Sequence, residues 1–159
     1  MMTDLHRDTL RVAETLLTFA KEDGFVLRRA VSSAYYALFQ GLCAVVAESM
    51  SRSTSVTSEY RRAFRALDHR QCRNSLNQSA EFKNDLGVPF AELQDIRQWA
   101  DYSVTPHPDD LIARTGASFN HGQAHFYYRK AHIAIYYLDG LDLAQKARLM
   151  VTLVVKERS

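Results

Sequence analysis

The stretch that decides the fold reads Arg28-Arg29-Ala30-Val31-Ser32-Ser33-Ala34-Tyr35-Tyr36-Ala37-Leu38-Phe39-Gln40. It opens a run without charge, residues 30–47. Large apolar residues recur through this run at steps of four, three, four and three, which is the spacing of one helical face: Val31, Tyr35, Leu38, Leu42 and Val45. The run is long enough to approach a membrane span, but it contains serines, a glutamine and a glycine. We interpret it as a buried central helix rather than a membrane-spanning one.

The rest of the chain also shows helical patterns and no alternating strand pattern of useful length. Expected breaks are Asp23-Gly24, a polar linker over 51–58, a loop or broken helix over 74–88, and Thr105-Pro106-His107-Pro108. These breaks predict a first helix from Thr3 or Asp4 to about Glu22 and a second from Phe25 to about Met50. A third helix follows residue 58, and a fourth begins at Pro89. A fifth helix ends at Gly140, and a last one begins at Asp142, which forms a capping box with Gln145. The sequence therefore predicts an all-α antiparallel bundle of five to six helices, one domain over residues 1–159.

Composition and charge are those of an ordinary globular protein. Of 159 residues, 47% are hydrophobic and 24% charged. The net charge of +2 is too small to indicate binding of nucleic acid by the protein's overall charge. Cys43 and Cys72 are too few for a disulfide framework or a cysteine-built zinc site, and residues 1–8 hold no signal-peptide core. We expect a cytoplasmic protein with no membrane contact.

Arginines gather between residues 52 and 73. The arginines are Arg52, Arg61, Arg62, Arg65, Arg70 and Arg73. The only acidic residues in the same segment are Glu59 and Asp68. Within one continuous helix Arg62 and His69, seven residues apart, would share a face. Three interpretations stay open for this Arg61–Arg73 segment: a solvated face, contact with RNA phosphates through forked donors, or catalysis.

Three histidines lie on the expected helix before Gly140. His121 and His125 are four residues apart, and His132 continues the same flank. An i, i+4 pair can hold zinc, but the glutamate of zinc proteases is absent from His121-Gly122-Gln123-Ala124-His125. We interpret these histidines as polar neighbours of the apolar stripe and expect no metal site.

A second string, Arg97-Gln98-Trp99-Ala100-Asp101-Tyr102, stands before the last long helices. Together with the 28–40 stretch it resembles a bacterial branch of the HEPN superfamily, small all-helical domains, over about residues 5–155. Relatives usually carry histidine where this chain has Gln40. In the family's ribonucleases an arginine is followed four to six residues later by a histidine, and the two motifs meet across a dimer without metal. This chain has Arg97, but Asp101 and Tyr102 stand where that histidine is expected.

The resemblance implies a homodimer that binds RNA or nucleotides in a toxin, defence or stress-response system, without a cofactor. For a metal-independent ribonuclease, the catalytic candidates are Arg97, Asp101 and Tyr102, with His69 as the alternative proton carrier. The candidates for RNA or phosphate binding are Arg28, Arg29, Arg62, Arg65 and Arg70. The other interpretation is a non-catalytic helical module that dimerises or docks to an antitoxin or a nucleotidyltransferase.

Overall fold

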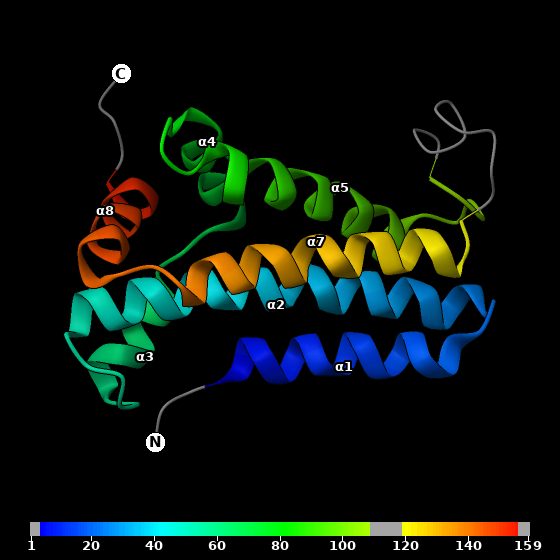
Figure 1. Cartoon of the computed structure of the whole chain (residues 1–159), viewed down its shortest axis with the longest axis horizontal. Coiled ribbons are helices and arrows are strands. Elements are labelled where there is room, and N and C mark those ends of the chain that lie inside the picture. The colour runs from blue at the N-terminus through cyan, green and yellow to red at the C-terminus, as the bar shows by residue number, and fades with distance from the viewer. Residues whose placement is uncertain (1–3, 109–118, 156–159) are drawn as a thin grey trace.

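The computed structural model describes residues 4–108 and 119–155, and these residues form helices and connecting segments without a strand. The expectation of an all-α fold is confirmed. The elements are labelled in Figure 1: α1 (Leu5–Ala20), α2 (Gly24–Ser51), α3 (Ser58–Phe64), α4 (His69–Gln78), the short π-helix η1 (Lys83–Gly87), α5 (Val88–Tyr102), α7 (His121–Asp139) and α8 (Leu143–Val154).

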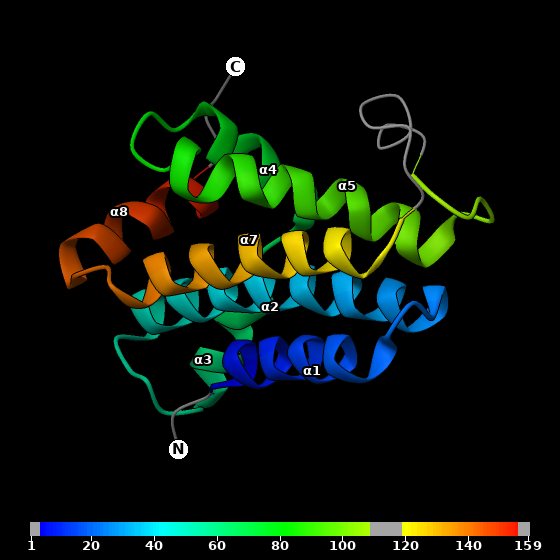
Figure 2. The same cartoon turned by 45° about the vertical axis from the view of Figure 1, so that its right-hand side comes forward.

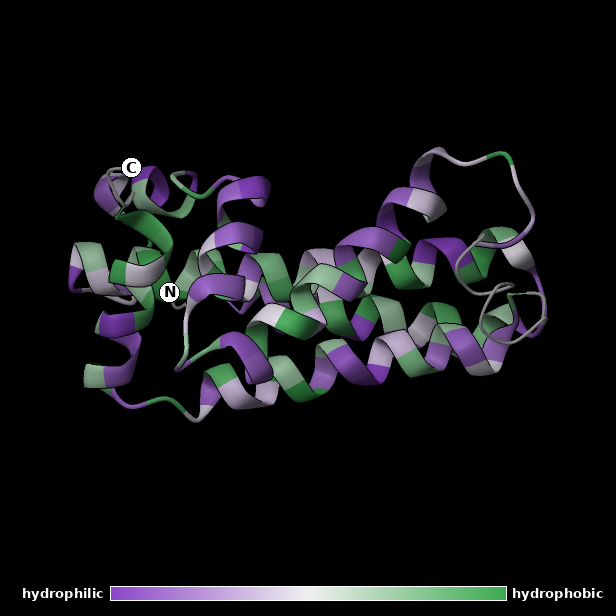
Figure 3. Ribbon diagram, turned by 90° about the horizontal axis from the view of Figure 1, so that it is seen from above, coloured by the Kyte–Doolittle hydropathy of each residue, from purple (hydrophilic) through white to green (hydrophobic). Residues whose placement is uncertain are grey.

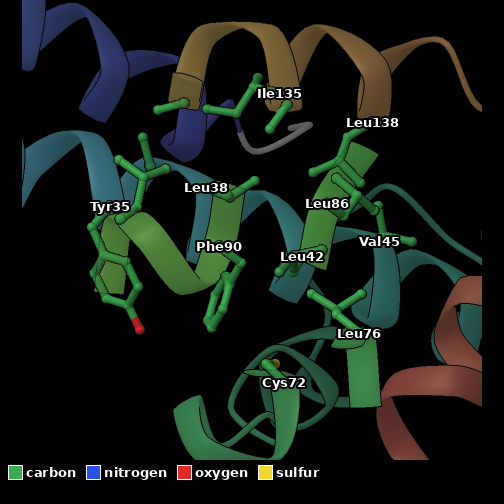
Figure 4. Packing of buried hydrophobic residues seen from close by; sticks show 14 of the residues in the cluster. Tyr35, Leu38, Leu42, Val45, Cys72, Leu76, Leu86, Phe90, Ile135 and Leu138 are labelled. Atoms are coloured by element: carbon green, nitrogen blue, oxygen red, sulfur yellow. The ribbon is translucent and has the colours of Figure 1, made fainter. Parts of the chain in front are cut away.

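Helix α2 is the centre of the molecule. It packs against α1, α5 and α7 along its length and against α3 and α8 near its end (Figures 1 and 2). Gly41 permits this close packing, since a Cβ atom there would lie 3.2 Å from Leu138 Cδ1. Figure 4 shows the main core around α2, to which α4, α5 and α7 contribute Cys72, Phe90 and Ile135.

The apolar length of α2 also meets the simple criteria for a membrane span, and within the described residues it is the helix that does so. However, 78% of its apolar window is buried inside the protein. A core helix needs the same composition, so the length and hydropathy of α2 are explained by packing. Along the surrounding helices, hydrophobic and hydrophilic positions alternate as amphipathic packing requires (Figure 3).

Several predicted helix ends are confirmed. The Asp142 carboxylate accepts a hydrogen bond from Gln145 N at 2.8 Å, and the side-chain oxygen of Gln145 accepts one from Asp142 N at 2.9 Å, which completes the capping box. Gly140 ends α7. Asp23 caps α2 rather than merely ending α1, because its carboxylate accepts from Phe25 N and Val26 N. Asp4 occupies the N-cap position of α1, but its side chain makes no cap hydrogen bond; Thr3 lies outside the described residues.

The expected single helix after residue 58 is wrong, because the chain there forms two helices. α3 ends at Phe64, and α4 begins at His69. Asp68 separates them: its extended backbone cannot continue a helix, and its side chain accepts a hydrogen bond from Gln71 N at 2.9 Å. With this break the described residues contain more than the predicted five to six helices.

Of the two alternatives predicted for residues 74–88, a loop or a broken helix, the structure has the broken helix. α4 continues to Gln78, and η1 follows before Val88 and Pro89 open α5. Gly87 lies so close to α4 that a Cβ atom would be 2.9 Å from the Leu76 carbonyl oxygen. Glycine is therefore required where the π-helix crosses α4.

Candidate functional site

Tyr35 and His69 form a buried polar contact between α2 and α4. The Tyr35 side chain is fully buried, and its hydroxyl lies 2.5 Å from Nδ1 of His69. The imidazole also stacks on Phe39, with 3.8 Å between ring centroids. These two neighbours fix the position and plane of the His69 ring. The buried tyrosine hydroxyl of the core helix is thus satisfied by a polar partner from another helix.

Arg97 approaches the same tyrosine from α5. Its guanidinium carbon lies 4.9 Å from the Tyr35 ring centroid and 5.6 Å from that of Tyr36, within the range of cation–π attraction. The Arg97 side chain is 13% exposed, so it reaches solvent only at its edge. The fold thus brings Arg97 and His69, which are far apart in sequence, to one tyrosine ring.

Asp101 links this pair to a second arginine. Its carboxylate lies 2.6 Å from Nη2 of Arg29 and 3.8 Å from Nη1 of Arg97. Both arginines also have an Nε atom that is buried without a hydrogen-bond partner. Two guanidinium groups share one carboxylate, so the cluster keeps a surplus positive charge. A phosphate oxygen would complement that surplus.

Burial sets the protonation of the two central groups. It lowers the pKa of His69 from its ordinary value; the positive charge of Arg97 acts in the same direction, and Asp68 opposes both. Burial also raises the pKa of the Tyr35 hydroxyl, which the Arg97 charge only partly offsets. Near neutral pH the imidazole is therefore neutral and the phenol keeps its proton. When Tyr35 donates to Nδ1, Nε2 carries the imidazole proton; when Nδ1 donates, Nε2 can accept one.

Three other residues named from the sequence lie apart from this cluster. Tyr102 is 74% exposed at the end of α5. His107 follows in the segment after α5, and its carbonyl oxygen accepts from Thr105 Oγ1. Arg28 donates to the carbonyl oxygens of Ser103 and Thr105. Its guanidinium also lies 4.3 Å above the Trp99 ring, so it fastens this segment to α2.

The break between α3 and α4 divides the arginine segment. Arg62 lies on α3 and Arg65 caps its end, whereas Arg70 belongs to α4; all three are exposed. Arg73 is paired with Asp95 at 2.6 Å. The expected shared helical face of Arg62 and His69 is wrong, because the two residues belong to different helices.

Of the three histidines on α7, His121 contacts a neighbouring helix, whereas His125 and His132 are exposed. Nε2 of His121 lies 2.9 Å from the Leu17 carbonyl oxygen, which ties α7 to α1. The His121 and His125 ring centroids are 6.4 Å apart. Within the part of the chain that the structure describes, no group of three or more histidine, cysteine, aspartate or glutamate side chains could hold a metal ion.

The sequence placed Arg97, Asp101 and His69 in one set of catalytic candidates and Arg29 among the phosphate-binding ones, but it did not predict that Tyr35 and Asp101 join them in one cluster. It missed Phe39 as the stacking partner of His69, and the only available signal was the aromatic Tyr35-Tyr36-x-x-Phe39 pattern beside the predicted packing face. Comparison of the chain with protein-family models, curated proteins and solved structures gave no match.

Proposed function

We propose that this chain is a HEPN-like protein that binds RNA or a nucleotide by its phosphate at the Arg97–His69 cluster. The observation that supports this most is the contact of both residues with Tyr35. The resemblance leads one to expect an arginine and a histidine within one short motif; here α5 and α4 supply them separately. The setting proposed is a bacterial toxin, defence or stress-response system.

We also propose that the same residues cleave RNA without a metal ion. In this proposal the 2′-hydroxyl oxygen bonds to phosphorus, the bond to the 5′-oxygen breaks, and a 2′,3′-cyclic phosphate and a 5′-hydroxyl result. Neutral His69 takes the 2′-hydroxyl proton, water protonates the leaving oxygen, and Arg97 stabilises the charge that gathers on phosphorus. Asp101 orients the arginines instead of acting as a base, because its carboxylate is occupied by two guanidinium groups.

The burial of His69 and Arg97 favours a second function, that of a non-catalytic interaction module. The His69 ring is covered by Phe39 and Tyr35, and Arg97 is mostly buried. A cluster packed in this way also suits a structural role. The alternative is therefore a non-catalytic helical module that pairs with itself, an antitoxin or a nucleotidyltransferase.

The test measures RNA cleavage in EDTA together with growth arrest on expression. We expect slow cleavage that leaves cyclic-phosphate ends and is lost in both Arg97→Lys and His69→Asn, because lysine keeps the charge but loses the fork. His125→Ala, at an exposed position of α7, is the matched control and should retain activity. Salt-sensitive RNA binding without cleavage would support a binding protein alone. Absence of both would leave the interaction module.

Homodimerisation belongs to this proposal, because the resemblance implies two clusters that face each other across a two-fold axis. The chain mass is 18.2 kDa. Light scattering at micromolar concentration should therefore give about twice that mass. A strict monomer would contradict a site shared between protomers.

A further inference from the structure

An apolar hollow lies between α3 and the start of α1, away from the Arg97–His69 cluster. It has a volume of about 450 Å³. Apolar side chains form most of its wall and two arginines form its rim: Leu5, Val56, Tyr60, Phe64, Arg61 and Arg65. Figure 2 shows α3 beside the N-terminal end of α1. A hollow of this kind accepts an apolar side chain and places an anionic group beside it.

Three exposed arginines, Arg61, Arg62 and Arg65, lie at or beside this hollow. Among the described residues, no acidic side chain lies within 4 Å of the guanidinium groups of Arg61, Arg62 or Arg65, although Arg73 and Arg148 are each paired. All three are exposed, and α3 contains only one acidic residue, Glu59. The surface therefore presents a positive charge that, among the described residues, Glu59 offsets only in part through its attraction to Arg62.

The apolar surface continues along α1. Leu5, Val12 and Phe19 are 45%, 51% and 78% exposed and recur every seven residues. Between them, Val12 and Leu16 line a shallow hollow together with Thr15 and with Asp8 and Arg11, which are paired with each other at 3.3 Å. The opposite side of α1 is buried against α2. From Leu5 to Phe19 the stripe is about 21 Å long at 1.5 Å per residue. This length matches about four turns of a helix laid alongside.

We propose that α1 and α3 together form a docking site for an acidic amphipathic helix of a partner protein. Its apolar face would lie on the α1 stripe with one large side chain in the hollow, and its carboxylates would pair with Arg61 and Arg65. The aliphatic part of the stripe, Leu5, Val12 and Leu16, distinguishes this partner from RNA, because the bases of RNA stack on aromatic rings and its phosphates gain nothing from aliphatic side chains.

A second copy of this chain fits the site less well. In a two-fold pairing of α1 helices, the end that carries Phe19 would face the partner's arginines. The carboxylates at that end are already engaged: Glu22 accepts from His121 N, and Asp23 caps α2. The charge on α3 would thus stay largely uncompensated.

The test uses a fluorescent helical peptide of about sixteen residues, with leucines on one face and glutamates elsewhere, and a second peptide with lysine in place of each glutamate. In low salt the glutamate peptide should bind and the lysine peptide should not. The double change Arg61→Glu with Arg65→Glu, and separately Val12→Asp, should each weaken binding about tenfold or more. Ile133→Asp, at a 61% exposed position of α7, is the matched control and should leave binding unchanged.

Four results would overturn the proposal. They are equal binding of both peptides, no binding of either, conversion of a dimer to a monomer by Val12→Asp, and loss of RNA binding in the arginine double variant while peptide binding persists. Circular dichroism checks that each variant is folded. None of these results depends on cleavage, so the docking site and the Arg97–His69 site are tested separately.

Discussion

The contact between Tyr35 and His69 can be tested by removing one oxygen atom. Tyr35→Phe keeps the buried ring and its packing against Phe90, but it takes away the hydroxyl that lies 2.5 Å from His69 Nδ1. The imidazole would then be held by ring contacts alone, with Phe39, with Tyr36 and with the ring at position 35. We therefore expect lower stability together with a less ordered His69.

The expected loss of stability depends on which of the two hydrogen-bond partners, Tyr35 or His69, remains in the variant. A protein hydrogen bond contributes about 0.5–1.5 kcal/mol net, and a buried polar group left without a partner costs about 1–3 kcal/mol. His69 is half-buried, so water can reach it when the tyrosine hydroxyl is gone, and Tyr35→Phe should cost about 1 kcal/mol. His69→Leu should cost more, because it leaves the fully buried hydroxyl unpaired.

Urea unfolding of the two single variants and the double variant gives a double-mutant cycle. The coupling energy should be about 1 kcal/mol. Tyr36→Phe is the matched control: the same atom is removed from the neighbouring ring, whose hydroxyl makes no hydrogen bond in the described structure, and stability should barely change. A neutral Tyr35→Phe with no coupling to His69 would refute the contact.

Three further predictions concern stability. Gly87→Ala should destabilise the fold by about 1–3 kcal/mol in urea unfolding, because the new Cβ would meet the Leu76 carbonyl oxygen at 2.9 Å; an unchanged midpoint would contradict that contact. Asp142→Ala should cost about 1 kcal/mol in the same assay through loss of its hydrogen bond to Gln145 N, and a neutral result would contradict the cap. Because the folded-state pKa of His69 lies below the ordinary 6.5, the unfolded chain binds more protons between the two values. Unfolding free energy should therefore fall as pH drops from 6.5 through the folded-state pKa, and this fall should shrink in His69→Asn.

Local signals in the sequence predicted helix ends well. A capping box such as Asp142 with Gln145 is decided by four consecutive residues, and the glycine after α7 acts through its own backbone. The central position of α2 also followed from its uncharged length. These features depend on little beyond neighbouring residues.

The break at residues 65–68 was not predicted, because Tyr60, Phe64 and Leu67 continue a helical spacing across it. Asp68 can cap a helix or lie exposed within one, and tertiary packing decides between the two. In the structure Tyr60 packs with Ala47 and Ala63, whereas Leu67 packs against the main core. The two helices therefore bury their apolar sides in different places.

The candidate residues could be named from the sequence, but the contacts that join them could not be predicted. Arg97 of α5 and His69 of α4 both contact Tyr35 of α2. Because the three residues lie on three helices that are far apart in sequence, no rule of residue spacing connects them. The link of Arg29 to Asp101 spans two helices in the same way. Such contacts depend on how α4 and α5 pack, which periodicity does not determine.

The most direct test of the Arg97–His69 site is the pKa of His69, measured by NMR with and without a short single-stranded RNA. A phosphate bound beside the imidazole favours its protonated form, so RNA should raise the pKa of His69, and Arg97→Ala should abolish that rise. A pKa of His69 that stays unchanged while RNA is bound would contradict the proposed site.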